Sequence, residues 1–137
     1  MTDLMIPEVD LVTRLTRREQ IAWCEQFNAL EPQIPLEVTH VFSDGLYSRT
    51  MRIPKGTLLT GAIHRRAHLS VVLQGRISVY TETGTEQYEA PCLFSSPPGT
   101  KRVGYAHTDT IWVTVHATQA TTVKDAEAEL IVTHFED

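Results

Sequence analysis

The chain contains 137 residues, of which 42% are hydrophobic and 21% are charged, so it is long enough to bury the core of one domain. Twelve Lys and Arg residues against 17 Asp and Glu residues leave a formal net charge of −5, which argues against a surface for nucleic acids. No apolar run reaches the ~18 residues of a membrane span, and the acidic start of the chain is unlike a signal peptide. We therefore expect no nucleic-acid or membrane partner, and no secretion by a signal peptide.

The first predicted element is a helix from about Arg17 to Ala29. Thr16 and Glu19 fit a capping box, in which each side chain accepts a hydrogen bond from the backbone N–H of the other residue. Trp23 and Phe27 belong to an apolar stripe at helical spacing, and such a stripe must pack against something. Two alternatives stay open: the stripe packs on the main body, or Trp23 and Phe27 contact a partner subunit.

From Ile34 onward, short runs of Val, Ile, Leu, Tyr and Thr alternate with turns that contain Gly and Pro. This pattern predicts an all-β sandwich or barrel. We expect one hairpin to join Leu69–Tyr80 to Thr85–Glu89, and a second to join Lys101–Tyr105 to Ile111–His116.

The tail of the chain contains good helix formers, which favours a short C-terminal helix near residues 123–131. We thus expect one domain with an N-terminal segment that carries the docking helix (1–33), a β-barrel (34–120) and a C-terminal segment packed on the barrel (121–137). Alternation along the strands predicts two faces. One face should carry Val71, Leu73, Ile111, Val113 and Val115, and the other Ser70, Val72, Trp112 and Thr114.

His64 and His68 lie in the β-rich part of the chain, separated by three residues. An even spacing on extended backbone directs both side chains to one side of a sheet, where two imidazoles can begin a metal site. A stable transition-metal site needs three or four ligands. The alternative is a pair of hydrogen-bonded histidines in a polar part of the core.

Two segments resemble the sequence motifs of the cupin superfamily. In the first motif a Gly, two histidines one residue apart and a Glu precede a closing Gly, and the segment Gly61–Gly75 is similar to it. In the second, a Pro-x-Gly turn precedes a metal-binding His by three residues, as in Pro97-Pro98-Gly99. The resemblance spans roughly Ile53 to His116 and implies an antiparallel jelly-roll barrel. The runs 101–107 and 112–116 are similar to small cupin-like proteins of bacteriophages and prophages.

The departures from the cupin motifs concern the metal ligands. The four ligand positions of the family fall on Ala62, His64, His68 and Arg102, so only His64 keeps the family's residue. An imidazole at His68 can still bind a metal, whereas the guanidinium of Arg102 cannot and repels a cation. His116 can supply a third nitrogen if the second hairpin places it beside the strand of Arg102.

Arg102 also suggests a second kind of site. Inside a barrel it would offer a clamp for a carboxylate or phosphate. The lining of this anion pocket would be Arg102, His64, His68, Ser70 and Thr114, with His116 nearby. If the guanidinium bonds to the imidazoles, we expect an anion or a water there and no metal. The alternative is that Arg102 points outward or pairs with an acid such as Glu89 or Glu82.

Two functions follow from this resemblance. The first is a non-catalytic cupin-like module, a bacteriophage accessory or virion component in the host cytoplasm or the virion, which forms a homo-oligomer or binds other virion proteins and needs no cofactor. The loss of two of the four family ligands favours it. The second is a small metal-dependent enzyme of the isomerase or dioxygenase type, with one divalent transition metal on His64, His68 and His116.

Overall fold

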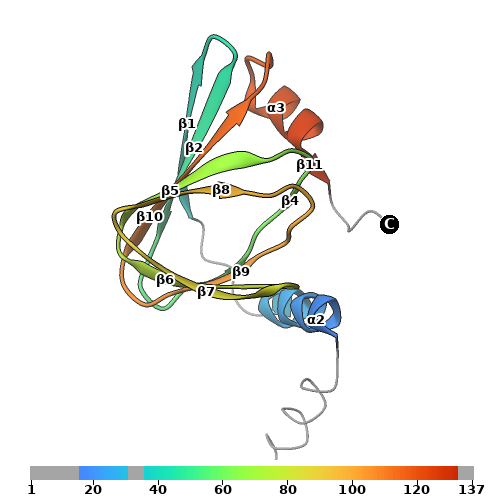
Figure 1. Cartoon of the computed structure of the whole chain (residues 1–137), viewed down its shortest axis with the longest axis vertical. Helices are drawn as coiled ribbons and strands as arrows, with labels where there is room; N and C mark the ends of the chain where they lie inside the picture. Colours follow the sequence, from blue (N-terminus) through green and yellow to red (C-terminus); the bar gives the residue numbers. More distant parts are fainter. Residues whose placement is uncertain (1–15, 31–35, 133–137) are drawn as a thin grey trace, which may run out of the picture.

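The structure, a computed structural model, describes residues 16–30 and 36–132, and the side chains of residues 27–30 lie outside the described part. Two sheets face each other around a common interior (Figure 1). The larger sheet contains, in spatial order, β1 (Glu37–Ser43), β2 (Leu46–Ile53), β10 (Thr110–Ala117), β5 (His68–Gln74) and β8 (Cys92–Ser96). The smaller sheet contains β3 (Leu58–Thr60), β9 (Val103–Ala106), β6 (Arg76–Thr81) and β7 (Gly84–Glu89). Within these sheets the strand pairs are antiparallel, as the predicted jelly roll requires.

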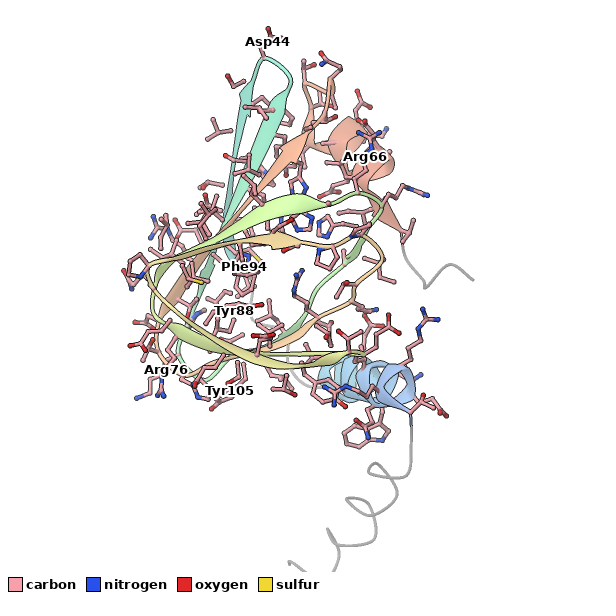
Figure 2. The ribbon with its side chains drawn as sticks, in the orientation of Figure 1. Asp44, Arg66, Arg76, Tyr88, Phe94 and Tyr105 are labelled. Atoms are coloured by element: carbon pink, nitrogen blue, oxygen red, sulfur yellow. The ribbon has the colours of Figure 1, made fainter. Side chains whose placement is uncertain are left out.

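The space between the two sheets holds the main core. The predicted alternation is confirmed, because Val72 and Trp112 are buried inside while Leu73, their neighbour on the other face, is exposed. The buried members of this core are Ile53, Val72, Ile77, Val79, Ala106 and Trp112. Figure 2 shows Tyr88 and Phe94 inside the barrel, where their rings stack with centroids 4.1 Å apart.

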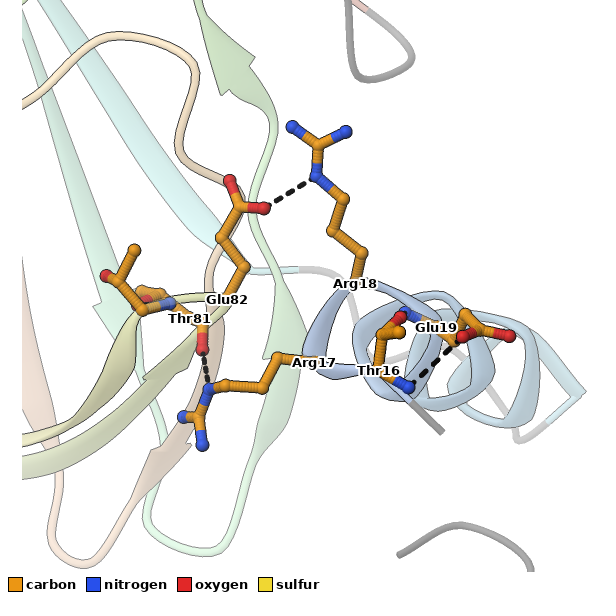
Figure 3. A network of polar contacts seen from close by, with 7 residues as sticks. Thr16, Arg17, Arg18, Glu19, Thr81 and Glu82 are labelled. Atoms are coloured by element: carbon orange, nitrogen blue, oxygen red, sulfur yellow. Dashed lines mark hydrogen bonds and ion pairs between the residues drawn. The ribbon is translucent and has the colours of Figure 1, made fainter. Parts of the chain in front are cut away.

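The predicted N-terminal helix is confirmed as α2 (Arg17–Leu30). Its capping box forms as expected. The backbone N–H of Glu19 donates to Thr16 Oγ1 over 3.2 Å, and the N–H of Thr16 donates to Glu19 Oε1 over 3.1 Å (Figure 3). These reciprocal bonds satisfy backbone donors that the first turn of a helix leaves without a partner.

The helix α2 packs on the smaller sheet. Ile21 is fully buried there, so the stripe covers the main body of the protein. Arg17 lies over the ring of Tyr80 at 3.9 Å and donates to the carbonyl of Thr81, which anchors the start of the helix (Figure 3). Trp23 is 38% exposed, and the side chain of Phe27 lies outside the described part. Contact of these two residues with a partner subunit therefore stays a prediction.

Both predicted hairpins need correction. The segment Leu69–Tyr80 is two strands, because β5 joins the larger sheet and β6 the smaller one, and only β6 and β7 form the hairpin. The second hairpin is wrong, since β9 pairs with β3 and β6 whereas β10 pairs with β2 and β5. In the first case the chain crosses between the sheets near Gly75, where a continuous strand was expected, and in the second it crosses where a tight reversal was expected.

The C-terminal segment closes one end of the barrel. A short helix, α3 (Val123–Leu130), starts at Thr122, whose hydroxyl accepts a bond from the N–H of Asp125. It packs on Tyr47 and is followed by β11 (Ile131–Val132), which pairs with β4 (Ile63–His64). Figure 1 shows α3 beside the far end of β2 and β10. Within the described ranges, neither helix has the length and apolar character needed to cross a membrane.

Candidate metal centre and cavity

The barrel interior contains a cavity of about 750 Å³. Its walls come from both sheets and from the C-terminal segment, including Ala126, Glu127 and Ile131. A volume of this size is typical of sites for small molecules.

Strand register arranges the inner face of the larger sheet in three layers. Thr114 lies opposite Arg49 on one side and Ser70 on the other, and the inward residues two positions away form the neighbouring layers. We call these the imidazole layer (Tyr47, His116, His68), the polar layer (Arg49, Thr114, Ser70) and the apolar layer (Met51, Trp112, Val72). The cavity therefore changes from polar to apolar along the strands.

His64, His68 and His116 come together at the polar end. Their ring centroids are 4.3 Å apart for His64 and His68, 5.0 Å for His64 and His116, and 4.6 Å for His68 and His116. One nitrogen of each lies within 4.8 Å of the others. Sequence reasoning grouped these three histidines, but the basis for His116 was wrong. It reaches the group from β10, beside β5, and not through a hairpin with the strand after Arg102.

Among the residues that the structure describes, two ring nitrogens of this group find no hydrogen-bond partner. His64 Nδ1 and His68 Nε2 are buried and unpaired, which costs about 1–3 kcal/mol for each atom. His68 Nδ1 lies 3.4 Å from the carbonyl oxygen of Arg66, to which only an N–H can donate. That tautomer leaves a lone pair on Nε2, and a backbone carbonyl is a usual second partner for a metal-binding imidazole. The donor set therefore fits a transition metal.

Burial keeps the imidazoles in the form that binds metals. Desolvation, with a smaller contribution from the neighbouring histidines, lowers the pKa of His64 to about 3. Burial likewise lowers the pKa of His116 to about 4 and lowers the pKa of His68. At neutral pH all three rings are neutral and can offer a lone pair.

Arg102 lies in the segment before β9 and lines the cavity, so the outward alternative is wrong. Its backbone carbonyl accepts a bond from the N–H of Gly61. Glu82, one proposed partner, pairs instead with Arg18. In the part of the chain that the structure describes, the guanidinium of Arg102 has no carboxylate partner and makes no bond to either unpaired nitrogen.

The anion pocket expected from the sequence is partly rearranged. Thr114 lines the cavity and contacts His116 Nε2 at 2.9 Å, but Ser70 does not line it. The Ser70 hydroxyl is fully buried and bonds to the hydroxyl of Ser96 at 2.7 Å. Sequence reasoning missed much of the cavity lining, including Tyr47, Arg49 and Glu127. The signal for Arg49 was its place in the alternation of β2, where Tyr47, Arg49, Met51 and Ile53 share the inner face.

The sequence matches no protein-family model and no curated protein. Solved structures do resemble the fold. An RmlC-like cupin from Shewanella frigidimarina is 19% identical, with a TM-score of 0.54 over 70% of this chain and 85% of that chain. KdgF from Halomonas sp. is 18% identical, with a TM-score of 0.51 over 64% and 82%. A variant of oxalate decarboxylase from Bacillus subtilis is 16% identical, with a TM-score of 0.58 over 74% of this chain but 29% of that chain. These likenesses support the resemblance to cupins and show that the chain has a cupin-type jelly-roll fold.

Proposed function

We propose that the protein is a small metal-dependent enzyme that holds one divalent transition metal on His64, His68 and His116. The observation that carries this proposal is the pair of buried ring nitrogens without partners, His64 Nδ1 and His68 Nε2, next to a third imidazole. Leaving such atoms unpaired destabilises the fold, and a metal ion would satisfy both at once.

The position of the histidine group favours catalysis over a structural role. Three protein ligands leave a coordination position open for water or substrate, as in catalytic sites, whereas structural sites are closed by four. Here that position adjoins a cavity large enough for a small molecule. Imidazole ligands suit zinc, iron, nickel or copper, and a bound ion would polarise a substrate oxygen or activate water.

The fold does not select the reaction. The solved structures that resemble this chain include an oxalate decarboxylase and a Streptococcus pyogenes protein of unknown function. A reaction of the isomerase or dioxygenase type is what the sequence resemblance to cupins implies.

A non-catalytic role as a bacteriophage component is the second candidate. It draws on Arg102, which replaces a family ligand and adds a positive charge to the cavity. Its phage and virion elements rest on the sequence resemblance alone. This candidate predicts that the wild-type protein binds no metal and that Arg102→His creates a site.

Zinc titration of chelator-treated protein tests the proposal. We expect about one zinc ion per chain, with binding lost in His64→Ala and His68→Ala and weakened at least tenfold in His116→Ala. His107→Ala is the matched control, because His107 bonds to Ser78 and lies outside the histidine group. Absence of zinc binding in wild type, together with binding in Arg102→His, would overturn the metal centre and favour the non-catalytic candidate.

A further inference from the structure

We propose that the cavity binds a small monocarboxylate with an apolar body, whose carboxylate lies between Arg49 and Arg102 and whose body lies against the apolar layer. The inference rests on the proposed function in one respect, because it places this ligand beside the proposed metal ion. The anion site itself depends only on the two arginines and the cavity walls.

The excess positive charge of the cavity favours the binding of an anion. Among the described residues that line it, the arginines and acids are Arg49, Arg102 and Glu127. In the described part of the chain, neither guanidinium has an ion-pair partner. Two arginines against one carboxylate leave one positive charge in excess, so a monoanion neutralises the cavity.

The electrostatic influence of both arginines reaches the histidines. The charge of Arg102 contributes to the lowered pKa of His64 and of His68, and the charge of Arg49 to the lowered pKa of His64 and of His116. Arg49 on β2 and Arg102 in the segment before β9 line the same cavity as the three histidines. An anion held by both arginines would share this cavity with the proposed metal ion.

The apolar walls of the cavity indicate that the rest of the ligand is apolar. The next inward residue after Arg49 on β2 is Met51, and with Trp112 of β10 opposite it this part of the inner face is apolar. Leu59, Ile77 and Val79 continue the apolar surface outside the larger sheet. A multiply charged or polyhydroxylated ligand would leave polar groups without partners against these side chains. A carboxylate head with an apolar body matches both the charge and the walls.

An anion in this place would also support metal binding. Without the anion, the charge of a divalent ion adds to the positive charges of Arg49 and Arg102. When the anion is bound, its negative charge offsets one of these positive charges. Binding of the carboxylate and binding of the ion must then strengthen each other by the same factor.

Cyclohexanecarboxylate is a suitable probe, and calorimetry on metal-free protein measures its binding directly. Trp112 in the apolar layer gives a second signal, read as fluorescence in a Trp23→Phe background, because the chain has two tryptophans. Cyclohexylmethanol tests the need for charge, and acetate the need for an apolar body. Arg52→Gln is the matched control for Arg49→Gln and Arg102→Gln, since Arg52 is an exposed residue of the same strand β2.

We expect the carboxylate to bind and to change Trp112 fluorescence, with affinity lowered about tenfold or more by Arg49→Gln and by Arg102→Gln but not by Arg52→Gln. Zinc should raise the affinity further. Equal binding of cyclohexylmethanol, undiminished binding by both cavity variants, or no binding of the carboxylate would each overturn the proposal. If zinc fails to bind while the arginine-dependent carboxylate site persists, the metal centre is wrong and the anion site stands.

Discussion

Burial is the main cause of the lowered pKa values of the three histidines, and the charges of Arg102 and Arg49 and neighbouring histidines contribute to some of them. Folding therefore removes protons that the unfolded chain would carry near pH 5. The unfolded pKa of His64 is near its ordinary value of 6.5, and the folded pKa is about 3. Between these values the unfolded state binds more protons, so stability rises with pH and is lost as pH falls.

We predict that the metal-free protein loses free energy of unfolding as the pH falls from about 6.5 to about 4, by up to ~1.4 kcal/mol per pH unit for each buried histidine. His64→Gln should reduce this slope, and His64→Gln with His116→Gln should reduce it further, since the folded pKa of His116 is about 4. Urea unfolding at pH 7 and pH 5 in the presence of a chelator measures the effect. A slope unchanged by both substitutions would contradict it.

Gly75 closes the first cupin-like motif for a steric reason. Its φ of +89° is unfavourable for other residues, and a Cβ would lie 2.3 Å from the carbonyl oxygen of Asp109. Gly75→Ala should destabilise the protein by ~3 kcal/mol, combining backbone strain with this overlap. Gly56→Ala isolates the strain, because its φ is +82° with nothing near a new Cβ, and should cost ~1–2 kcal/mol. Equal losses in thermal or urea unfolding would refute the steric explanation.

Among the elements, α2 depends on charged contacts as well as on Ile21. The Lys101 ammonium pairs with Glu25 of this helix, and the Lys101 side chain is 10% exposed. A buried ammonium without its partner is costly, whereas an apolar side chain of similar length is not. The two partners should therefore respond differently to substitution.

We predict that Glu25→Ala lowers the free energy of unfolding by ~2 kcal/mol, because it leaves the Lys101 charge buried and unpaired. Lys101→Met should cost less than ~1 kcal/mol, and in its background Glu25→Ala should have little further effect. A double-mutant cycle by urea unfolding gives these values. Equal costs for both single substitutions would mean that the contact is an ordinary surface ion pair.

Sequence reasoning succeeded where the determinants are local. The capping box at Thr16 depends on a few neighbouring residues, and it forms as expected. Strand pairing is not local. The partner of β10 on one side is β2, more than fifty residues earlier in the chain, so spacing could not show the route of His116 to the site. Alternation along β2 gives the face of Arg49, but not the strand that lies beside it.

At the scale of the whole molecule, the outer face of the larger sheet is apolar. It contains exposed leucines on β5 and β8, with half-buried valines beside them. We call this face the outer patch, formed by Leu69, Val71, Leu73, Leu93, Val113 and Val115. A contiguous apolar face of this kind favours contact with a second copy of the chain. It offers an alternative to Trp23 and Phe27 for the homo-oligomer predicted from the sequence.

We predict that the protein is a dimer in solution and that Leu73→Lys with Leu93→Lys converts it to a monomer. Two like charges within the patch of each copy would oppose its burial. Light scattering coupled to gel filtration gives the mass. Tyr105→Lys, an exposed apolar position on the other sheet, should leave the dimer intact. A monomeric wild type, or a dimer that survives the double substitution, would exclude this interface.

The pairing of β11 with β4 has a consequence for the order of events during synthesis. Ile131 lies opposite His64, so a wall of the histidine site is made from residues translated long after the first histidine. A nascent chain cannot enclose an ion until that late segment has left the ribosome and docked. Zinc fingers need their ion to fold, whereas this barrel has an apolar core of its own, so we expect the proposed ion to enter after folding. Loading would then be a separate cellular step, governed by which metals the surrounding compartment supplies.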